Sequence, residues 1–497
     1  MLKPGSFNIL YLMTDQHRVD SLGTYGNPIC KTPALDELAA QGTRFDQCYT
    51  ATSICTPARA TLLTGLLPFR HALVANYERN VAYREELDPA IIPFSRYLLD
   101  EGYRVGLVGK WHVGKEKGPE DYGFEGIHYP GWGNPVKHPD YLAYLQEKGL
   151  PPFQLLNEVR GNFPNGQPGN LLAGRLNQPV EATFEYYLAE RTIERLREYA
   201  ANFRETGQPF YLACHWFGPH LPYLLPEKYY NLYDPAQVEL PLSFAETFAG
   251  KPTVQKNYSA HWTFDSFSRE DWRKIIALSW GYVTMIDEQV GRIMAVVREL
   301  GLLDSTAIMF SADHGAFVGS HRLEDKGPAM YDDTYRIPFI LKVPGAKPGH
   351  VEQSFVSLTD FMPTFLDLAG LEKPSQAEGE SVRPFTSGEI PDNWRQEIVA
   401  EFHGHHFPYP QRMIRTERYK LVVNPGDVNE LYDLEADPHE LLNQYEHPEL
   451  KEVRRDLMTR LYQTLRARGD NFYHWMTTMY DVGQKTYDTS LSQFDSK

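Results

Sequence analysis

Residues 53–65, Ser-Ile-Cys-Thr-Pro-Ala-Arg-Ala-Thr-Leu-Leu-Thr-Gly, combine side chains that are well suited to chemistry. Pro57 fits the first position of a helix, where a missing N–H costs nothing. We therefore expect a helix that begins at Pro57, with Cys55 beside its unpaired N–H groups and the positive end of its dipole. Arg59 adds a fixed positive charge in the first turn. The stretch predicts an anion-binding site, and taken alone it is equally consistent with a buried structural cysteine.

Other polar side chains follow apolar runs that we predict to be buried strands. These runs cover residues 7–13, 43–50, 103–109, 209–213 and 306–311. Helices are predicted near residues 33–41, 93–101, 182–204 and 270–300. Alternating strands and helices indicate a mostly parallel sheet covered on both faces, and ligands bind beyond the carboxyl ends of such strands. The polar residues expected to meet Cys55 at that edge are Asp15, Lys110, His220 and Asp313.

The chain changes character after about residue 340, where shorter strand-like runs replace the alternation. Those runs cover residues 397–402, 412–423 and 429–434, and a helix is predicted near 447–467. We expect an α/β fold in which helices sandwich a large, mostly parallel mixed sheet, with a smaller α+β subdomain that contains an antiparallel sheet. The expected parts are residues 1–385, 386–470 and an aromatic tail, 471–497. The tail would either cover its own domain or dock on a second subunit, which would make a homo-oligomer.

Bulk composition argues against several classes of partner. The formal net charge of −16 disfavours nucleic acid and anionic membrane surfaces. No apolar run reaches the 18 residues of a membrane span, and the N-terminus lacks a signal-peptide pattern. The four cysteines show neither metal-type spacing nor the density of a disulfide framework. We therefore expect a reduced, cytoplasmic protein.

Two pairs of residues predict a metal site. Asp15 and Gln16 offer oxygen ligands, and Asp313 and His314 offer a carboxylate and an imidazole. A mainly oxygen shell suits a hard divalent cation, whereas a histidine shifts the preference toward manganese. Because each pair follows a predicted strand, both should reach the same sheet edge.

The Cys-x-Pro-x-Arg pattern at 55–59, followed by Leu-Leu-Thr-Gly, resembles the signature of type I sulfatases in the alkaline phosphatase superfamily. Three further family elements have counterparts in Gly109-Lys110-Trp111-His112, Pro219-His220-Leu221-Pro222 and Asp325-Lys326-Gly327. The resemblance runs from Asn8 to Pro438 and so covers nearly the whole chain. Within the family, the chain most resembles members such as choline sulfatases and phosphonate monoester hydrolases.

The resemblance implies that a formylglycine-generating enzyme oxidises Cys55 to formylglycine. It implies metal ligands at Asp15, Gln16, residue 55, Asp313 and His314. Calcium is the expected ion. Many members have Asp-Asp and Asp-Asn where this chain has Asp-Gln and Asp-His, and this difference leaves manganese open as the alternative. The catalytic residues that it implies are Cys55, Arg59, Lys110, His112, His220 and Lys326, with Asn76 as a contact to the substrate anion.

In the mechanism implied by the resemblance, hydrated formylglycine attacks sulfur through a metal-bound hydroxyl that Asp313 activates. His220 and Lys326 protonate the departing alcohol or phenol, which leaves a covalent sulfate ester. His112 then takes the proton of the second hydroxyl, and collapse releases sulfate. The expected substrate is a sulfate ester of a small molecule or saccharide.

Two other functions are consistent with the same residues. A phosphonate monoester or phosphodiester hydrolase would use the same nucleophile, but such enzymes tend to lack the basic pair seen here as Lys110 and His112. A non-catalytic anion-binding homologue is expected to have lost at least one key residue of the site. All four are present: Cys55, Arg59, Asp313 and Lys326. Aryl, carbohydrate and choline-like esters all remain open as substrates.

Overall fold

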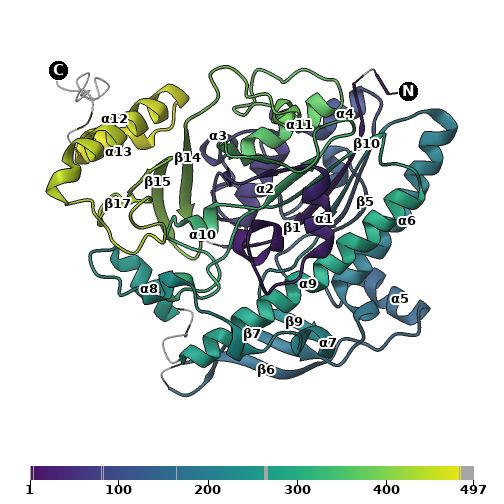
Figure 1. The fold of residues 1–497 in the computed structure, drawn as a ribbon, viewed down its shortest axis with the longest axis horizontal. Helices are drawn as coiled ribbons and strands as arrows, with labels where there is room; N and C mark the ends of the chain where they lie inside the picture. The colour runs from purple at the N-terminus through teal and green to yellow at the C-terminus, as the bar shows by residue number, and fades with distance from the viewer. Residues whose placement is uncertain are drawn as a thin grey trace, which may run out of the picture.

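The computed structural model describes residues 2–480 except 4, 80, 82, 164, 262 and 264–266, together with residue 482. In this part of the chain the largest sheet has eight strands, in the order β12-β2-β11-β10-β1-β8-β4-β5 (Figure 1). Its central parallel strands are β10 Thr306–Ala312, β1 Asn8–Thr14, β8 Phe210–His215, β4 Arg104–Lys110 and β5 Glu125–Tyr129. The outer strands are β11 Phe339–Lys342, β2 Thr43–Phe45 and β12 His350–Glu352. Because β11 pairs antiparallel with both neighbours, the expected mixed and mostly parallel sheet is confirmed.

Both faces of this sheet are apolar and covered by helices. Alternate residues of β1 enter two separate cores, Leu10 and Leu12 on one face and Ile9, Tyr11 and Met13 on the other. The first face packs against α1 Pro33–Gln41, α6 Phe184–Thr206 and α9 Arg269–Glu299 (Figure 1). The second packs against α2 Cys55–Thr64, α4 Phe94–Asp100 and α11 Phe361–Leu368.

Two predicted strands are divided in the structure, so those two predictions were wrong. The run at 43–50 becomes β2 and a separate β3, Cys48–Tyr49, which pairs with β13, Val356–Ser357. The run at 412–423 becomes β15 Pro408–Thr416 and β16 Tyr419–Val423, which are antiparallel neighbours. The turns between the pieces contain neither Gly nor Pro, the residues that most clearly mark a turn in a sequence.

The C-terminal sheet consists of β14 Glu397–Gly404, β15, β16 and β17 Glu430–Asp433 in the described residues. One of its faces packs on α12 Lys451–Arg468 and α13 Phe472–Met479 (Figure 1). Its other face shares a core with Tyr49 and Ile54, close to Cys55. The α+β character is confirmed, whereas the division at residue 385 stays a prediction.

The predicted aromatic tail is partly helical. Phe472 and Met476 of α13 are buried in the core beneath the C-terminal sheet, so this part of the tail covers its own domain. Residue 481 and residues 483–497 lie outside the described residues.

Several elements were not predicted from the sequence. A small sheet formed by β6 Leu155–Asn162, β7 Pro168–Leu176 and β9 Tyr223–Pro226 lies beside α9 (Figure 1). The remaining α-helices of the described chain are α3 Pro68–His71, α5 Pro139–Glu147, α7 Glu227–Tyr230, α8 Thr253–His261 and α10 Asp332–Tyr335. None of the described helices combines the length and apolar composition needed to span a bilayer.

We expect Gly109→Ala to destabilise the protein more than Gly26→Ala. Gly109 has φ +115°, and a Cβ there would lie 2.0 Å from the backbone oxygen of His215 on β8. Gly26 has φ +102° and nothing within 4 Å of its Cβ position, so its substitution adds backbone strain alone. The expected costs are about 2–4 kcal/mol and about 1 kcal/mol. Equal midpoints of thermal unfolding for the two variants would contradict this account.

Candidate active site

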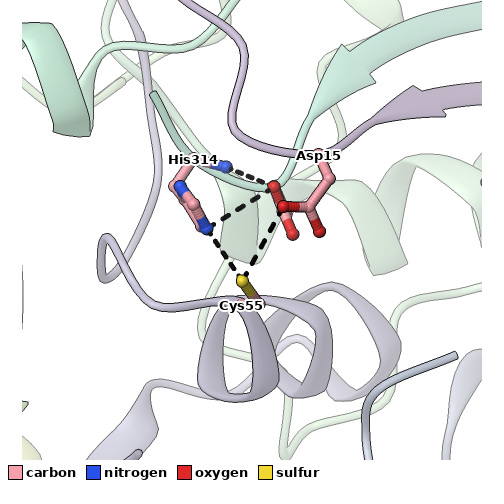
Figure 2. Close-up of side chains that lie close together, drawn as sticks. Asp15, Cys55 and His314 are labelled. Atoms are coloured by element: carbon pink, nitrogen blue, oxygen red, sulfur yellow. Dashed lines mark hydrogen bonds and ion pairs between the residues drawn. The ribbon is translucent and has the colours of Figure 1, made fainter. Parts of the chain in front are cut away.

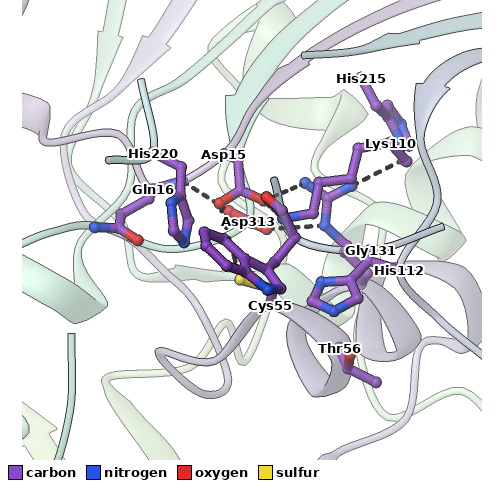
Figure 3. Close-up of polar contacts among 12 residues, drawn as sticks. Asp15, Gln16, Cys55, Thr56, Lys110, His112, Gly131, His215, His220 and Asp313 are labelled. Atoms are coloured by element: carbon purple, nitrogen blue, oxygen red, sulfur yellow. Dashed lines mark hydrogen bonds and ion pairs between the residues drawn. The ribbon is translucent and has the colours of Figure 1, made fainter. Parts of the chain in front are cut away.

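Residues from distant parts of the chain meet at the carboxyl edge of the large sheet (Figure 3). They follow or end strands β1, β4, β8 and β10, and they are Asp15, Gln16, Lys110, His220, Asp313 and His314. Cys55 approaches them as the first residue of α2. The prediction that this helix begins at Pro57 was wrong. Pro57 is its third residue, a position whose N–H would also have no partner within the helix.

Arg59 links two buried carboxylates. Its Nη2 donates to Asp15 Oδ2 at 2.7 Å, and its Nε donates to Asp313 Oδ2 at 2.9 Å. Lys110 Nζ donates to the same Asp15 oxygen at 2.7 Å. Burial alone would raise the pKa of Asp15, but Lys110 and Arg59 hold it well below its usual range. Asp15 is therefore an ionised carboxylate in a water-poor site.

The ligand atoms of Asp15, Cys55, Asp313 and His314 all lie within 4.8 Å of one another (Figure 2). His314 Nδ1 donates to the Gly315 carbonyl at 2.8 Å, so the lone pair of Nε2 faces Cys55 Sγ, 3.2 Å away. Burial lowers the pKa of His314, which favours the neutral imidazole that metals bind. Two carboxylates, an imidazole and residue 55 fit a divalent cation.

Gln16, which was predicted to bind the metal, contacts Lys326 in this structure. Its Oε1 accepts a hydrogen bond from Lys326 Nζ at 2.8 Å, and its backbone N–H donates to Asp313 Oδ1 at 3.0 Å. Gln16 adopts φ +58°, a left-handed conformation that is uncommon for non-glycine residues and often marks functional sites. Its role as a metal ligand stays a prediction.

Lys326 and His220 form a pair whose proton positions follow from the geometry. Lys326 Nζ lies 2.9 Å from His220 Nε2 and 3.1 Å from Asp325 Oδ1. An ammonium group can only donate, so His220 Nε2 is the acceptor and the ring proton is on Nδ1, which donates to the Leu221 carbonyl. Burial and Lys326 lower the pKa of His220 to about 3. Burial alone would lower the pKa of Lys326, but Asp325 raises it, so the lysine carries the charge.

His112 lies on the opposite side of Cys55 from His220 in Figure 3. Its Nε2 lies 2.9 Å from Glu78 Oε1, and its Nδ1 is buried without a hydrogen-bond partner. Burial alone would raise the pKa of Glu78, but the hydrogen bond with His112 lowers it, so the ionised carboxylate accepts a hydrogen bond from Nε2–H. His112 Nδ1 is thus free to take a proton. Glu78 was missed because it lies in a loop with no motif.

Asn76 lies at the N-terminus of α2, beside Cys55. Its Oδ1 accepts from the backbone N–H of Thr56 at 3.0 Å, which satisfies one of the unpaired donors of the first turn. The amide NH2 group is the part that remains for an anion. Contact between Asn76 and substrate stays a prediction.

An α/β fold of this kind, with carboxylates, cations and a helix-terminal cysteine at its sheet edge, defines an alkaline-phosphatase-like hydrolase of anionic esters. The sulfatase family model matches residues 7–371, and a model of the C-terminal part of N-sulphoglucosamine sulphohydrolases matches residues 319–467. The chain therefore belongs to the type I sulfatases and is a sulfuric ester hydrolase.

Named relatives agree with this assignment. The chain is 25% identical to an N-acetylglucosamine-6-O-sulfatase of Bacteroides thetaiotaomicron, with 93% of this chain and 87% of the relative covered. It is 28% identical to an arylsulfatase of Clostridium perfringens, with 94% and 95% covered. The crystal structure of a phosphonate monoester hydrolase of Agrobacterium radiobacter matches with TM-score 0.77 at 25% identity, covering 93% of this chain and 96% of that one.

Arg59→Lys should weaken both folding and divalent-metal binding. A lysine cannot donate to Asp15, Asp313 and the Lys110 carbonyl together, as the guanidinium does. A buried carboxylate that loses a donor costs about 1–3 kcal/mol. Thermal unfolding and calorimetric titration with Ca²⁺ and Mn²⁺ measure the two effects.

The matched control is Arg84→Lys, because Arg84 pairs with Asp88 at the surface. It should change neither quantity. If Arg59→Lys binds the metal as tightly as the parent protein does, the guanidinium is not what holds the two carboxylates in place.

Proposed function

We propose that the protein hydrolyses a sulfate monoester by S–O cleavage and releases inorganic sulfate with an alcohol or phenol. The nucleophile is formylglycine, produced from Cys55 by a formylglycine-generating enzyme. The observation that carries this proposal is the position of Cys55. It begins α2 within hydrogen-bonding reach of His314, in the cluster that also contains Asp15 and Asp313.

The proposed activity requires two groups that are added after synthesis, namely formylglycine at residue 55 and a divalent metal. Formylglycine supplies a hydrate whose second hydroxyl allows sulfate to be expelled, which a serine could not do. A divalent metal, calcium or alternatively manganese, supplies positive charge for the anionic ester. Asp15, Asp313, His314 and residue 55 would hold the metal, with Gln16 as a further proposed ligand.

Arg59 and Lys110 prepare the site for an anion. Arg59 holds Asp15 and Asp313 in place, so both carboxylates face residue 55. Lys110 balances the charge of Asp15 and, with the Asn76 amide, stabilises the sulfate oxygens. A net charge of −16 does not attract an anion at long range, so this local positive charge is what binds the ester.

Lys326 and His220 serve the leaving oxygen. Lys326 holds the proton, and the neutral His220 shares it through Nε2, 2.9 Å away. The proton therefore comes from the ammonium group, which His220 Nε2 orients toward the departing oxygen by accepting a hydrogen bond from it.

His112 is the proposed base on the other side of residue 55. Its unpartnered Nδ1 can accept the proton that is lost when sulfate leaves. Glu78 positions this imidazole and fixes its tautomer by accepting from Nε2.

A phosphonate monoester or phosphodiester hydrolase is the second candidate, supported by the similarity to the Agrobacterium enzyme. Lys110 and His112 favour sulfate over this alternative. A comparison of kcat/KM for 4-nitrophenyl sulfate and 4-nitrophenyl phenylphosphonate decides between the two functions. A higher value for the sulfate supports the sulfatase, and a higher value for the phosphonate supports the alternative.

Cys55 should carry the aldehyde when the protein is made in a host with formylglycine-generating activity. The tryptic peptide Phe45–Arg59 would then have lost hydrogen sulfide and gained one oxygen, as measured by mass spectrometry. Cys48, in the same peptide, is the internal control and should remain a thiol. Cys55→Ser should lose sustained turnover while Cys48→Ser keeps it. A plain thiol at Cys55 in an active enzyme would refute the proposed nucleophile.

Glu78→Ala should lower kcat about 10–100-fold with little change in KM. Without the carboxylate, His112 is no longer held in the tautomer that leaves Nδ1 unprotonated, whereas the residues that bind the anion are unchanged. Glu78→Gln should restore part of the rate, since its amide oxygen can still accept from Nε2. The control is Glu85→Ala, which removes a surface partner of Lys115. If kcat is unchanged in Glu78→Ala, His112 does not depend on this carboxylate.

A further inference from the structure

A cavity of about 200 Å³ adjoins the proposed leaving-group residue His220. Its wall also includes Trp132, Phe153, Phe217, Leu224 and Tyr282. These residues come from separate loops and from strand β9 and helix α9, so the tertiary structure creates the cavity. For scale, a cavity of about 150 Å³ is enough to hold benzene.

The cavity shares lining residues with the proposed active site. His220 lines it and contacts Lys326 at 2.9 Å. Trp132 lines it too, and its backbone oxygen accepts from Lys110 Nζ at 3.4 Å. The ring of Phe217 lies 5.7 Å from the same ammonium group, and the rings of Trp132 and His220 lie 5.9 Å apart. A group attached to the oxygen beside His220 would therefore extend into this space.

The wall of the cavity has few charged or free hydrogen-bonding groups that could bind a sugar or a second anion. Among the described residues that line it there is no Lys, Arg, Asp or Glu. The Tyr282 hydroxyl donates to Glu185, and the Asn134 amide donates to Glu185 and Tyr282 at 3.3 Å each. These polar groups are thus occupied by one another, and Asn134 Oδ1 is a single buried acceptor. Apart from Trp132, which is 46% exposed, the wall gives the hydroxyls of a sugar ring few partners to replace the hydration they would lose.

We propose that this cavity holds the leaving group of the sulfate ester, and that this group is an apolar ring, aromatic or alicyclic. The inference rests on the proposed function, because it uses His220 to place the leaving oxygen. Trp132, Phe217 and Tyr282 offer faces and edges to such a ring, and burial of its apolar surface favours binding. The cavity thus selects the alcohol, whereas the cluster around Cys55 selects the sulfate.

The first experiment compares cyclohexylmethyl sulfate with galactose 6-sulfate. Both esters join sulfate to a CH2 group on a six-membered ring, so they differ chiefly in the hydroxyls of the ring. We expect kcat/KM to be about tenfold or more higher for the cyclohexylmethyl ester. Equal or higher kcat/KM for galactose 6-sulfate would overturn the inference and leave the sulfatase function intact.

The second experiment narrows the cavity with Leu224→Phe. This variant should raise KM for cyclohexylmethyl sulfate about tenfold and leave methyl sulfate hydrolysis unchanged, because methyl sulfate does not need the space. Leu242→Phe makes the same substitution on the surface, where Leu242 is 68% exposed, and should change neither substrate. Equal losses on both esters in a folded Leu224→Phe protein would show that the cavity does not hold the ring.

A binding measurement separates this inference from the proposed function. The fluorescence of 2-naphthol should report its binding to Cys55→Ala protein, and Leu224→Phe should weaken that binding about tenfold. If 2-naphthol binds equally tightly to Cys55→Ala protein with and without Leu224→Phe, the cavity assignment is overturned, even if Leu224→Phe lowers stability. If protein with the aldehyde at Cys55 hydrolyses no sulfate ester, the proposed function fails, while 2-naphthol still tests the cavity.

Discussion

The active site depends on the contact of one guanidinium group with two buried carboxylates. Arg59 extends from the second turn of α2 to Asp15 after β1 and Asp313 after β10, and it also donates to the Lys110 carbonyl at the end of β4. Each carboxylate would be costly to bury alone, and Arg59 would be costly to bury without them. The contact therefore fixes α2, and with it residue 55, against three strands of the sheet.

The positions of protons in the site follow from neighbouring groups that can only donate or only accept. A carbonyl beside His314 and a carboxylate beside His112 each accept a hydrogen bond from a ring N–H, which leaves the second ring nitrogen of each imidazole with a lone pair. The ammonium group of Lys326 has the opposite effect on His220, since it makes Nε2 an acceptor. The tautomers of these three histidines are thus set by carbonyl, carboxylate and ammonium partners.

The site is supported from two sides by parts of the chain that are distant in sequence. The C-terminal antiparallel sheet packs against Ile54, which directly precedes the helix that begins at Cys55. On the side of His220, residues from loops, β9 and α9 form the apolar cavity. The proposed anion site is therefore built on the edge of the large sheet, whereas the proposed site for the alcohol is built from loops, β9 and α9.

Residue order alone was enough to place the long strands and helices, because β1, β8 and β10 are continuous apolar runs and α9 begins with the Ser268–Asp271 capping box. It also brought Asp15, Lys110 and Asp313 to one edge, since parallel strands end together. It could not reveal the partner of His112, the turn of Gln16 toward Lys326 or the walls of the cavity. Those contacts join residues from 34 to 310 positions apart. Only the tertiary structure decides them, because they depend on side-chain packing between loops whose paths no local pattern determines.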